Sequence, residues 1–457
     1  MHKNTPKEGF IVLEKIREYI QNGQYAKIRT LIAEMNEADI AAMLEELELP
    51  GAELVKVFRM LPKSLAADVF SFLSLETEQM IITSLTDREA ANIIDNLFAD
   101  DAADLVEEMP ANVVKRLLAQ TTPETRRDIN HLLQYPEDSA GSIMTVELVD
   151  LKEDQTVAQA IEKIRKIGID KETINTCYVT DPYRKIRGTV SLRTLILGEK
   201  TDRIGDLMEE KVITINTMTD QEEVARMFQK YDFDAMPVVD SENRLVGIIT
   251  VDDVMDIIQQ EATEDIEMMA AITPTDKPYM KTTVFETWKK RIPWLLILMI
   301  SATFTGKIIQ GYEEALAAYA VLTAYIPMFM DTGGNAGGQA SATVIRSISL
   351  GELEFRDIFR VVWKEFKVAI LCGVTLSVLN FAKLLLFDRV SLQVALIVCM
   401  TVIFTVLVAK IVGCVLPILA KRVGFDPAVM ASPFITTIVD AVSLLIYFQI
   451  ATRVLHL

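Results

Sequence analysis

Histidine and cysteine, the residues that most often bind zinc and iron, are scarce in this chain of 457 residues. The three histidines are scattered, and the four cysteines form no C-x-x-C pair. A zinc or iron site built on imidazole or thiolate is therefore not expected. Three of the cysteines, Cys372, Cys399 and Cys414, lie in apolar runs and are interpreted as packing residues. Any metal bound by this chain is expected to have oxygen ligands.

The signatures of catalysis are also missing. We find no nucleophile with a base partner, no Walker-type glycine loop and no zinc motif, so an enzyme is not expected. The chain begins MHKNTPKEGF, which is polar and charged and has no apolar stretch typical of a cleavable signal peptide. The N-terminal part is therefore predicted to stay in the cytoplasm.

Positive charge is scarce in the first 284 residues, which contain 31 Lys and Arg against 53 Asp and Glu, a net charge of −22. From residue 285 to the end the balance is 15 against 11. A surface of charge −22 repels nucleic acid and anionic lipid headgroups, and it raises the local concentration of cations. Nucleic acid is therefore excluded as a partner, and small cations are expected.

Long apolar stretches are confined to the last part of the chain, at about residues 292–309, 315–332, 366–387, 391–420 and 428–451. Each has close to the roughly 20 residues that a helix needs to cross a bilayer. They predict an α-helical, multi-pass membrane domain with five spans. Basic flanking residues number ten on the side of the N-terminus and four on the other, so the N-terminus is predicted to be cytoplasmic and the C-terminus outside.

Residues 45–120 repeat every twelve positions. Six apolar residues share one phase of the repeat, and most of them precede Pro, Ser or Thr: Leu49, Leu61, Leu73, Leu85, Leu97 and Met109. Twelve residues hold about two helical turns and a reversal, too few for a stable isolated helix. The repeat predicts an all-α superhelical N domain of stacked short helices. A generic helical bundle is the alternative.

A duplicated α/β unit follows, from Gly141 to Gln260. Each copy has a helix, a strand, a glycine-led strand and a second helix, in that order. The second copy reads AMPVVD and then GIITVDD, and this pattern resembles a tandem pair of CBS domains. The resemblance implies a regulatory pair that binds adenosine nucleotides or metal and dimerises. The first copy reads TCYVTDP where the second has AMPVVDS, so ATP binding is left open.

One carboxylate, Asp440, lies well inside the last apolar segment. An acid in that position costs at least ~2.5 kcal/mol on insertion scales, and such acids usually line ion or substrate paths. We therefore predict that Asp440 is a pore ligand. Ser432 and Thr436 precede it at four-residue intervals and share its helix face. The alternative is a structural ion pair between Asp440 and Lys410 of the preceding helix.

A glycine-rich segment, DTGGNAGGQ at residues 331–339, lies between the second and third apolar stretches. Four glycines at membrane depth predict a non-helical break whose backbone carbonyls, together with the amides of Asn335 and Gln339, line water. The alternatives are a flexible loop and close helix packing through small residues.

These oxygen ligands suit a hard cation. Mg²⁺ loses its water reluctantly and is usually bound through one or two carboxylates, which Asp440 and its copy across a dimer axis would supply. The acidic superhelical domain, the CBS pair, the five spans, the GGNAG sequence and the P-x-x-T-x-x-x-D sequence ending at Asp440 together resemble the MgtE family of magnesium channels and transporters. The resemblance covers essentially the whole chain.

The resemblance to MgtE implies five parts: an acidic superhelix at 1–135, CBS domains at 136–200 and 201–262, a connecting plug helix at 263–284 and a pore domain at 285–457. It implies a homodimer in the plasma membrane whose second and fifth membrane helices line a central pore. In that pore Asp440 would bind the hydrated ion, and Asn335, Ser432 and Thr436 would line the path.

Regulatory Mg²⁺ between the cytoplasmic domains is also implied by the resemblance, holding the closed state. The residues that match are acids and one backbone carbonyl: Asp68, Asp100, Asp104, Gly141, Glu222, Asp232, Asp253 and Asp256, with Glu261, Glu264 and Asp265 on one side of the plug helix. Without metal the like charges would separate the domains, and with metal the domains would close.

Three other functions compete with this one. A CBS-regulated transporter of another divalent cation, such as Mn²⁺ or Co²⁺, is the main alternative. An anion channel would be expected to place Lys, Arg or backbone groups in its pore, and an intramembrane aspartate argues against it. A nucleotide sensor that is only anchored in the membrane needs neither a glycine-rich break nor a buried acid.

Overall fold

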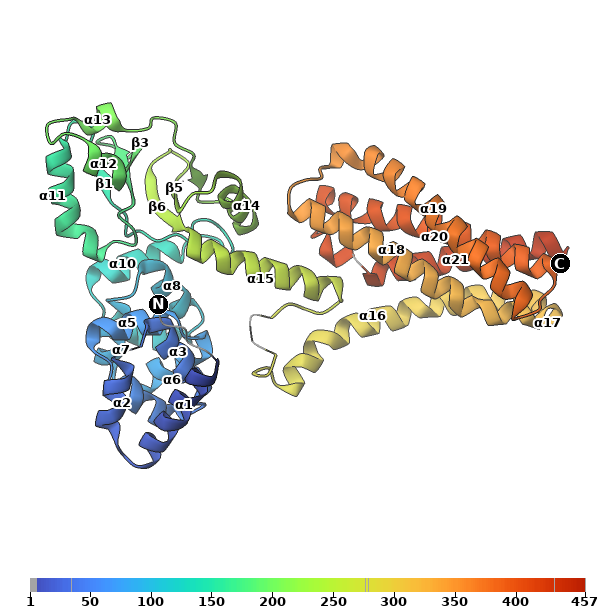
Figure 1. The fold of residues 1–457 in the computed structure, drawn as a ribbon, viewed down its shortest axis with the longest axis horizontal. Coiled ribbons are helices and arrows are strands. Elements are labelled where there is room, and N and C mark those ends of the chain that lie inside the picture. The colour runs from blue at the N-terminus through green and yellow to red at the C-terminus, as the bar shows by residue number, and fades with distance from the viewer. Residues whose placement is uncertain (1–5, 34, 276, 278, 431, 457) are drawn as a thin grey trace. The chain divides into compact units, whose positions relative to one another are not determined.

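The computed structural model describes residues 6–33, 35–275, 277, 279–430 and 432–456. The chain divides into two compact units, residues 1–255 and residues 256–457. Each is described by itself below, with the element labels of Figure 1.

Short helices fill the first unit up to residue 132 (Figure 1). They are α1 (Pro6–Gln21), α2 (Tyr25–Ile32), α3 (Glu37–Glu46), α4 (Gly51–Phe58), α5 (Lys63–Ser71), α6 (Leu75–Ser84), α7 (Asp87–Ile94), α8 (Ala99–Glu107), α9 (Ala111–Leu118) and α10 (Pro123–Leu132). From α4 to α10 each helix begins twelve residues after the one before it. Each helix from α3 to α8 packs on the helix two further along the chain. The predicted repeat of stacked short helices is confirmed.

The sequence fixes where these helices start and what they bury. The residue before α7 is Thr86, which forms a capping box with Glu89 and so satisfies exposed backbone N–H groups. Pro62 precedes α5 in an extended conformation that a helix interior does not allow. Apolar pairs near the helix ends, such as Val69 with Phe70, are fully buried. The core of the unit is therefore a continuous apolar line along the stack.

Two three-stranded sheets follow, β1–β2–β3 and β4–β5–β6. Their strands are β1 (Asp150–Leu151), β2 (Thr176–Thr180), β3 (Ile186–Ser191), β4 (Ile215–Asn216), β5 (Ala235–Val239) and β6 (Leu245–Thr250). The helices between and after them are α11 (Val157–Ile167), α12 (Leu192–Leu197), α13 (Ile204–Leu207), α14 (Gln221–Tyr231) and α15 (Val251–Met269), with a 3₁₀ turn η1 (Gly168–Asp170). In both sheets the first strand is parallel to the second and the second antiparallel to the third. The predicted duplication is confirmed.

The two copies are interlocked, because each pairs with a segment that belongs to the other. Thr145 exchanges backbone hydrogen bonds with Ile248 of β6, with N···O distances of 2.8 and 2.9 Å. Thr189 of β3 and Glu209 exchange two more, at 3.1 and 2.8 Å. A Cβ on Gly247, the third residue of β6, would lie 2.6 Å from the carbonyl oxygen of Thr145, so this crossing requires a glycine there.

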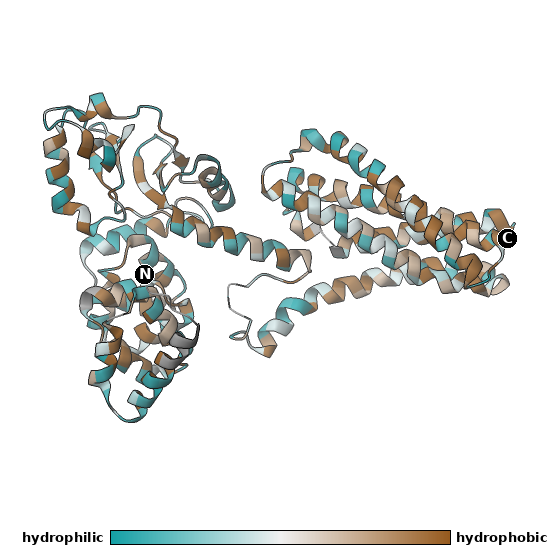
Figure 2. Cartoon of the chain, viewed as in Figure 1, coloured by the Kyte–Doolittle hydropathy of each residue, from teal (hydrophilic) through white to brown (hydrophobic). Residues whose placement is uncertain are grey.

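Long helices make up the second unit after α15 (Figure 1). They are α16 (Val284–Gly311), α17 (Glu313–Ala318), α18 (Ile326–Ser349), α19 (Ile358–Leu386), α20 (Leu392–Val423) and α21 (Ser432–Leu455), with 3₁₀ turns η2 (Ala320–Tyr325), η3 (Phe355–Asp357) and η4 (Ala428–Met430). Four described helices, at residues 284–311, 355–386, 392–423 and 433–455, are long and apolar enough to cross a membrane. Figure 2 shows hydrophobic residues along them. A multi-pass membrane domain is confirmed, and the count of five spans stays a prediction.

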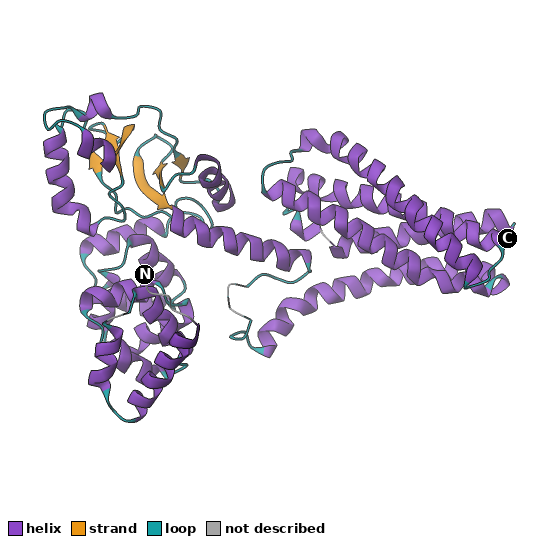
Figure 3. Ribbon diagram, viewed as in Figure 1, coloured by secondary structure: helices purple, strands orange, loops and turns teal. Residues whose placement is uncertain are grey.

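The second predicted span has the wrong bounds. Residues 315–332 are divided among α17, η2 and the first residues of α18. The glycine-rich residues 331–339 continue α18 as a regular helix (Figure 3). The predicted non-helical break is therefore wrong, because these glycines do not interrupt the backbone hydrogen bonds of the helix. Their polar neighbours also lower the hydropathy of α18, which explains why it is not among the four most apolar helices.

Candidate functional site

Glycines of α18 allow it to pack tightly against α20 and α21. A Cβ on Gly333 would lie 2.6 Å from Val439 Cγ1, and a Cβ on Gly337 would lie 2.6 Å from Ile435 Cγ2. Gly413 of α20 faces α18 directly, and a Cβ there would overlap the carbonyl oxygen of Gly337. Any larger residue would push these helices apart. Close packing through small residues, the alternative to a glycine break, is confirmed.

Asp440 follows Val439 on α21, beside this contact. Its Oδ1 atom is buried and has no hydrogen-bond partner among the described residues. A buried carboxylate oxygen without a partner is unfavourable, since it has lost water and gained nothing. A cation or a hydrogen-bond donor from outside the described chain would compensate for that loss.

Lys410 of α20, the alternative partner of Asp440, is paired with another residue. Its Nζ lies 3.6 Å from Oε2 of Glu365 on α19, and the two side chains are 6% and 14% exposed. Among the described residues, no ion pair joins Lys410 to Asp440. The alternative of a structural Asp440–Lys410 pair is therefore wrong, because Glu365 already compensates the lysine charge.

Thr436 of α21 and Asn335 of α18 lie at the contact between these two helices. Thr436 is one turn before Asp440, and its Cγ2 would lie 3.0 Å from a Cβ on Gly334. Asn335, the next residue of α18, is exposed and donates from Nδ2 to Oδ1 of Asp331 at 3.1 Å. The contact between α18 and α21 thus places Thr436 beside Gly334, the neighbour of Asn335, one helical turn before Asp440.

Ser432, the other predicted path residue, begins α21, and its side chain lies outside the described residues. The adjacent Pro433 carbonyl accepts hydrogen bonds from the hydroxyls of Thr436 and Thr437, each at 3.0 Å. The first turn of α21 is therefore held by its own threonines.

A cluster of acids, which we call the acidic cluster, lies in the first unit. It comprises Asp100, Asp101 and Asp104 of α8, Glu147, Glu172, and Asp252 and Asp253 of α15. Three predicted ligands, Asp100, Asp104 and Asp253, are thereby brought together. The acids come from the helical domain and from both CBS copies, which lie far apart in the sequence.

Burial and mutual repulsion both act on the acidic cluster. Burial, followed by the charges of Asp101 and Asp253, raises the pKa of Asp100 well above its usual value. Burial, followed by the charge of Asp253, raises the pKa of Asp101 to about 7. The same two effects raise the pKa of Glu172 to about 7. Asp104 is exposed, but the surrounding protein still removes part of its hydration, and this loss with the charges of Glu107 and Asp253 raises its pKa to about 6. Burial and like charges thus both disfavour the ionised form of Asp100, Asp101, Asp104 and Glu172, and a bound cation would favour it.

Glu147 connects the first CBS copy to the start of α8. Its Oε2 accepts hydrogen bonds from Thr145 Oγ1 at 2.6 Å and from the backbone N–H of Ala99 at 3.4 Å. The backbone N–H of Glu172 donates to the Glu147 carbonyl at 3.0 Å. A carboxylate at the N-terminus of a helix is favourable, so Glu147 has a structural role within the cluster.

Sequence reasoning missed several members of the acidic cluster: Asp101, Glu147, Glu172 and Asp252. Asp101 was within reach, because it stands between Asp100 and Asp104 in ADDAAD. Glu147 and Glu172 carry no local motif, and they are joined by a backbone hydrogen bond between segments that are separate in the sequence.

The other predicted ligands of the first unit lie apart from the acidic cluster. Asp68 is exposed, and a partial loss of hydration with the charge of Glu37 raises its pKa. Glu222 forms an ion pair with Arg226 at 2.8 Å. Asp232 is exposed and ends α14 in a left-handed conformation with φ of 53°.

Gly141 is buried, its N–H donates to the Thr217 carbonyl at 2.8 Å, and a Cβ there would overlap the ring of Tyr135. Its carbonyl remains the predicted ligand group. Among the described residues, no three His, Cys, Asp or Glu side chains are arranged to hold a metal ion. A cation in the acidic cluster would therefore be bound through its water shell or after the side chains move.

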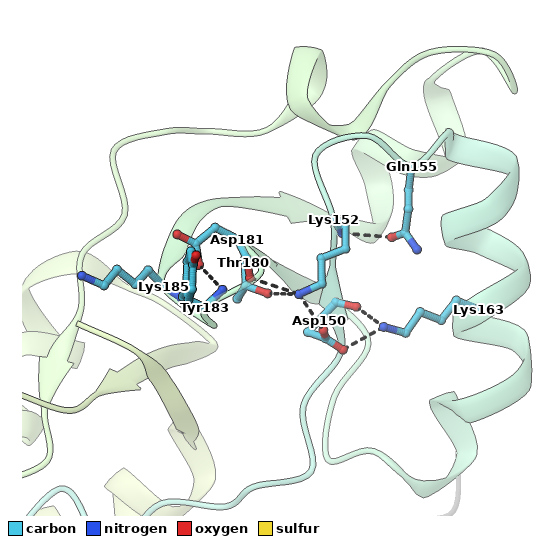
Figure 4. Close-up of polar contacts among 8 residues, drawn as sticks. All are labelled: Asp150, Lys152, Gln155, Lys163, Thr180, Asp181, Tyr183 and Lys185. Carbon is cyan, nitrogen blue, oxygen red and sulfur yellow. Dashed lines mark hydrogen bonds and ion pairs between the residues drawn. The ribbon is translucent and has the colours of Figure 1, made fainter. Parts of the chain in front are cut away.

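Asp150, by contrast, is an acid whose charge the chain itself balances (Figure 4). Lys163 Nζ lies 2.7 Å from its Oδ1, and Lys152 Nζ lies 3.5 Å from its Oδ2. Lys152 also donates to Thr180 Oγ1 at 2.6 Å. Burial acts to raise the pKa of Asp150, but the two lysines outweigh it and hold the pKa below its usual value. The charge of Asp150 is therefore balanced by two lysines of its own domain.

The end of α15 contacts the membrane domain within the second unit. Ser349 Oγ, at the end of α18, donates to Asp265 Oδ2 at 3.0 Å. Burial raises the pKa of Asp265, and the Ser349 hydroxyl opposes that shift. Met268 and Met269 pack against Ile345 of α18. The helix ends at Met269, so the predicted plug helix at 263–284 is wrong beyond that residue.

Three further predicted ligands lie on the same part of α15: Asp256, which is exposed, and Glu261 and Glu264, which are half-buried. The structure places Glu261, Glu264 and Asp265 within four residues of one another on one helix. Their role as ligands stays a prediction.

Family models match most of the chain. The MgtE intracellular N domain matches residues 35–138, CBS domains match residues 140–198 and 204–260, and the divalent cation transporter domain of MgtE matches residues 326–450. The magnesium transporter MgtE of Thermus thermophilus is 38% identical over 96% of this chain and 98% of that protein. The chain belongs to the MgtE family. MgtE of Bacillus subtilis is 33% identical, covering 96% of each chain. Both relatives are named as magnesium transporters, so the function of the family is not enzymatic.

Solved structures of MgtE cytosolic parts resemble the first half of this chain. The cytosolic domain of the Mg²⁺ channel MgtE in complex with ATP is 38% identical with a TM-score of 0.51, covering 54% of this chain and 99% of that one. The soluble part of a magnesium transporter is 29% identical with a TM-score of 0.52, covering 56% of this chain and all of that one.

Proposed function

We propose that this chain is a magnesium channel or transporter of the plasma membrane, with its ion path along α18 and α21. The observation that carries this proposal is the buried Oδ1 of Asp440, which has no partner among the described residues. A single carboxylate that acts through the water shell suits Mg²⁺, which loses its water reluctantly. Relatives named as magnesium transporters, matched over 96% of the chain, support the choice of ion.

A homodimer would complete the path. Asp331 and Asn335 are exposed on α18 in the single chain, although α18 packs among apolar helices. Polar side chains facing lipid are unfavourable, so a second copy and water would cover them. Two copies would also provide two Asp440 carboxylates around one hydrated ion, with Asn335, Ser432 and Thr436 along the path. The basic flanks favour a cytoplasmic N-terminus and an outside C-terminus.

Cytoplasmic Mg²⁺ would close the path by binding acids of the soluble part and of α15. Like charges of the acidic cluster repel one another, and a divalent cation removes that repulsion. The contact of Asp265 with Ser349 supports a route to the pore, because α18 itself carries the predicted path residues. The predicted ligands Asp68, Gly141, Glu222, Asp232, Asp256, Glu261 and Glu264 belong to the same proposal.

ATP is proposed as a ligand of the CBS pair, because a similar cytosolic domain is described in complex with it. In the second copy, Thr250 Oγ1 donates to Asp253 Oδ2 at 2.5 Å. The first copy has Ser191 and Thr194 at the corresponding places, with Ser191 capping α12. The second CBS copy thus has the acid Asp253 after its last strand, and the first CBS copy has Thr194 at that place.

Flux into proteoliposomes tests the proposal. Asp440→Asn keeps the size of the side chain and removes its charge, and we expect it to abolish Mg²⁺ uptake. The exposed acid Glu313, outside the proposed path, provides the control Glu313→Gln, which should transport like the wild type. Uptake at the wild-type rate by Asp440→Asn would overturn the path. Comparing Mg²⁺, Mn²⁺, Co²⁺ and Ca²⁺ in the same assay separates the magnesium function from the Mn²⁺ or Co²⁺ alternative.

A further inference from the structure

Two hydroxyl side chains are buried beside the contact between α18 and α21. Thr405 of α20 and Ser443 of α21 are both 0% exposed. A Cβ on Gly333 would lie 3.0 Å from Thr405 Cγ2 and 3.5 Å from Ser443 Oγ. The two side chains therefore meet at the same glycine of α18, although they come from different helices.

Neither hydroxyl has a hydrogen-bond partner among the described residues, and the same is true of Asp440 Oδ1. Threonine inside a helix can donate to the carbonyl four residues earlier. Thr401, one turn before Thr405 on α20, does so, with its Oγ1 2.8 Å from the Ile397 carbonyl. Thr405 does not, so its hydroxyl is available for another partner.

Asp440 lies on α21, the helix that carries Ser443. It precedes Ser443 by three residues on α21, and side chains three apart on a helix are neighbours. A hydroxyl both donates and accepts, whereas an ionised carboxylate only accepts. Thr405 can therefore donate to Ser443, and Ser443 can donate to Asp440 Oδ1. Rotation of the side chains would bring these donors to their acceptors, and the other carboxylate oxygen of Asp440, Oδ2, would remain for the ion.

We propose that Thr405 and Ser443 form a hydroxyl relay that orients the Asp440 carboxylate toward the ion. The proposal rests on Asp440 being the path ligand. Both residues are positioning residues, since they act through Asp440. Hydrogen-bonded residues behind an ion-binding carboxylate fix its orientation, and their loss typically weakens metal affinity about 10- to 100-fold.

The test is the Mg²⁺ dependence of flux through the full-length protein in proteoliposomes. Thr405→Val keeps the shape of threonine without the hydroxyl, and Ser443→Ala removes the other hydroxyl. Each should raise the half-saturating Mg²⁺ concentration about tenfold or more, with an unchanged thermal midpoint. Thr405→Ser keeps the hydroxyl and should retain the wild-type value.

Thr401→Val is the matched control, because Thr401 is equally buried on the same helix but is satisfied by its own backbone. It should leave the half-saturating concentration unchanged. Wild-type values for Thr405→Val and Ser443→Ala, with transport lost in Asp440→Asn, would overturn the relay alone. Equal losses in Thr405→Ser and Thr405→Val would also overturn it, because volume rather than the hydroxyl would then matter. Normal transport by Asp440→Asn would overturn the relay and the path together.

Discussion

Lys410 and Glu365 form an ion pair inside the helical membrane domain, with Nζ 3.6 Å from Oε2. The pair joins α20 to α19, the two helices with the most extensive mutual packing in this unit. It leaves Asp440 without a lysine partner, so the membrane domain separates a structural carboxylate from one that is available to a cation. Of these two acids of the membrane domain, Glu365 therefore has a neighbouring base, and Asp440 has no ion pair among the described residues.

Removal of one partner should destabilise the membrane domain strongly. Glu365→Gln leaves the Lys410 charge buried without compensation, which typically costs about 3–5 kcal/mol. The double variant Glu365→Gln with Lys410→Met has no buried charge and should recover most of the loss. Thermal unfolding of the detergent-solubilised protein at one scan rate measures both. A double variant no more stable than the single one would show that the ion pair is not what holds these helices.

The glycine contact between α18 and α20 gives a second prediction. Gly413→Ala places a methyl group against the Gly337 carbonyl and should separate the helices, which lowers the thermal midpoint and the yield of monodisperse protein. Gly306→Ala is the matched control, since a Cβ on Gly306 of α16 would meet nothing within 4 Å. In a helix interior that change should be neutral or stabilising by about 0.5–1 kcal/mol. Equal behaviour of the two variants in size-exclusion chromatography would contradict tight packing at Gly413.

These glycines show why the sequence predicted the membrane domain only in part. Hydropathy reports how many apolar residues a segment has, and α18 has few because glycines and polar residues occupy much of its surface. Gly337 is part of a close contact between two helices, and its partner in that contact is Gly413, which is distant in the sequence. The local sequence around Gly337 therefore does not show whether the glycine interrupts a helix or allows two helices to approach. The soluble helices were easier to predict, because the twelve-residue period is local and each repeat contains its own turn.

The candidate site was also predicted only in part. Asp440 was predicted because one charge in an apolar segment is visible in the sequence. The partner of Lys410 was not, since two carboxylates were available to it and only packing decides between them. Glu147 and Glu172 belong to the acidic cluster through a backbone hydrogen bond between distant segments.

Glu89 gives a prediction that depends on pH. It accepts hydrogen bonds from Arg59 at 2.9 and 3.0 Å and from Thr86, and these bonds lower its pKa to about 2. A lowered carboxyl pKa contributes stability that is complete above the unfolded value of about 4.3 and is lost as the pH falls toward 2. Glu89→Gln keeps the capping box but loses the ion pair, which at this exposed site is worth about 0.2–1 kcal/mol.

Hydrogen exchange of α7 in the intact protein measures this effect. Glu89→Gln should exchange faster than the wild type at pH 7, and Glu89→Ala faster still, because it also loses the cap, worth about 1 kcal/mol. The difference between Glu89→Gln and the wild type should shrink in high salt and between pH 4 and pH 2. A difference that persists at pH 2 would mean that the charge pair is not its cause.

Regulation by the acidic cluster gives the last prediction. Replacing Asp100 and Asp104 with Ala should leave the path open at millimolar cytoplasmic Mg²⁺, because a ligand closes a path only by binding the closed state more tightly. Glu53→Ala is the control, since this exposed acid of α4 occupies the repeat position that Asp101 occupies in α8. Flux into proteoliposomes, with Mg²⁺ titrated on the cytoplasmic side, measures closure. Closure of this variant at the wild-type Mg²⁺ concentration would show that Asp100 and Asp104 have no part in regulation. Closure without Mg²⁺ would show that they act only by repulsion and do not bind the ion.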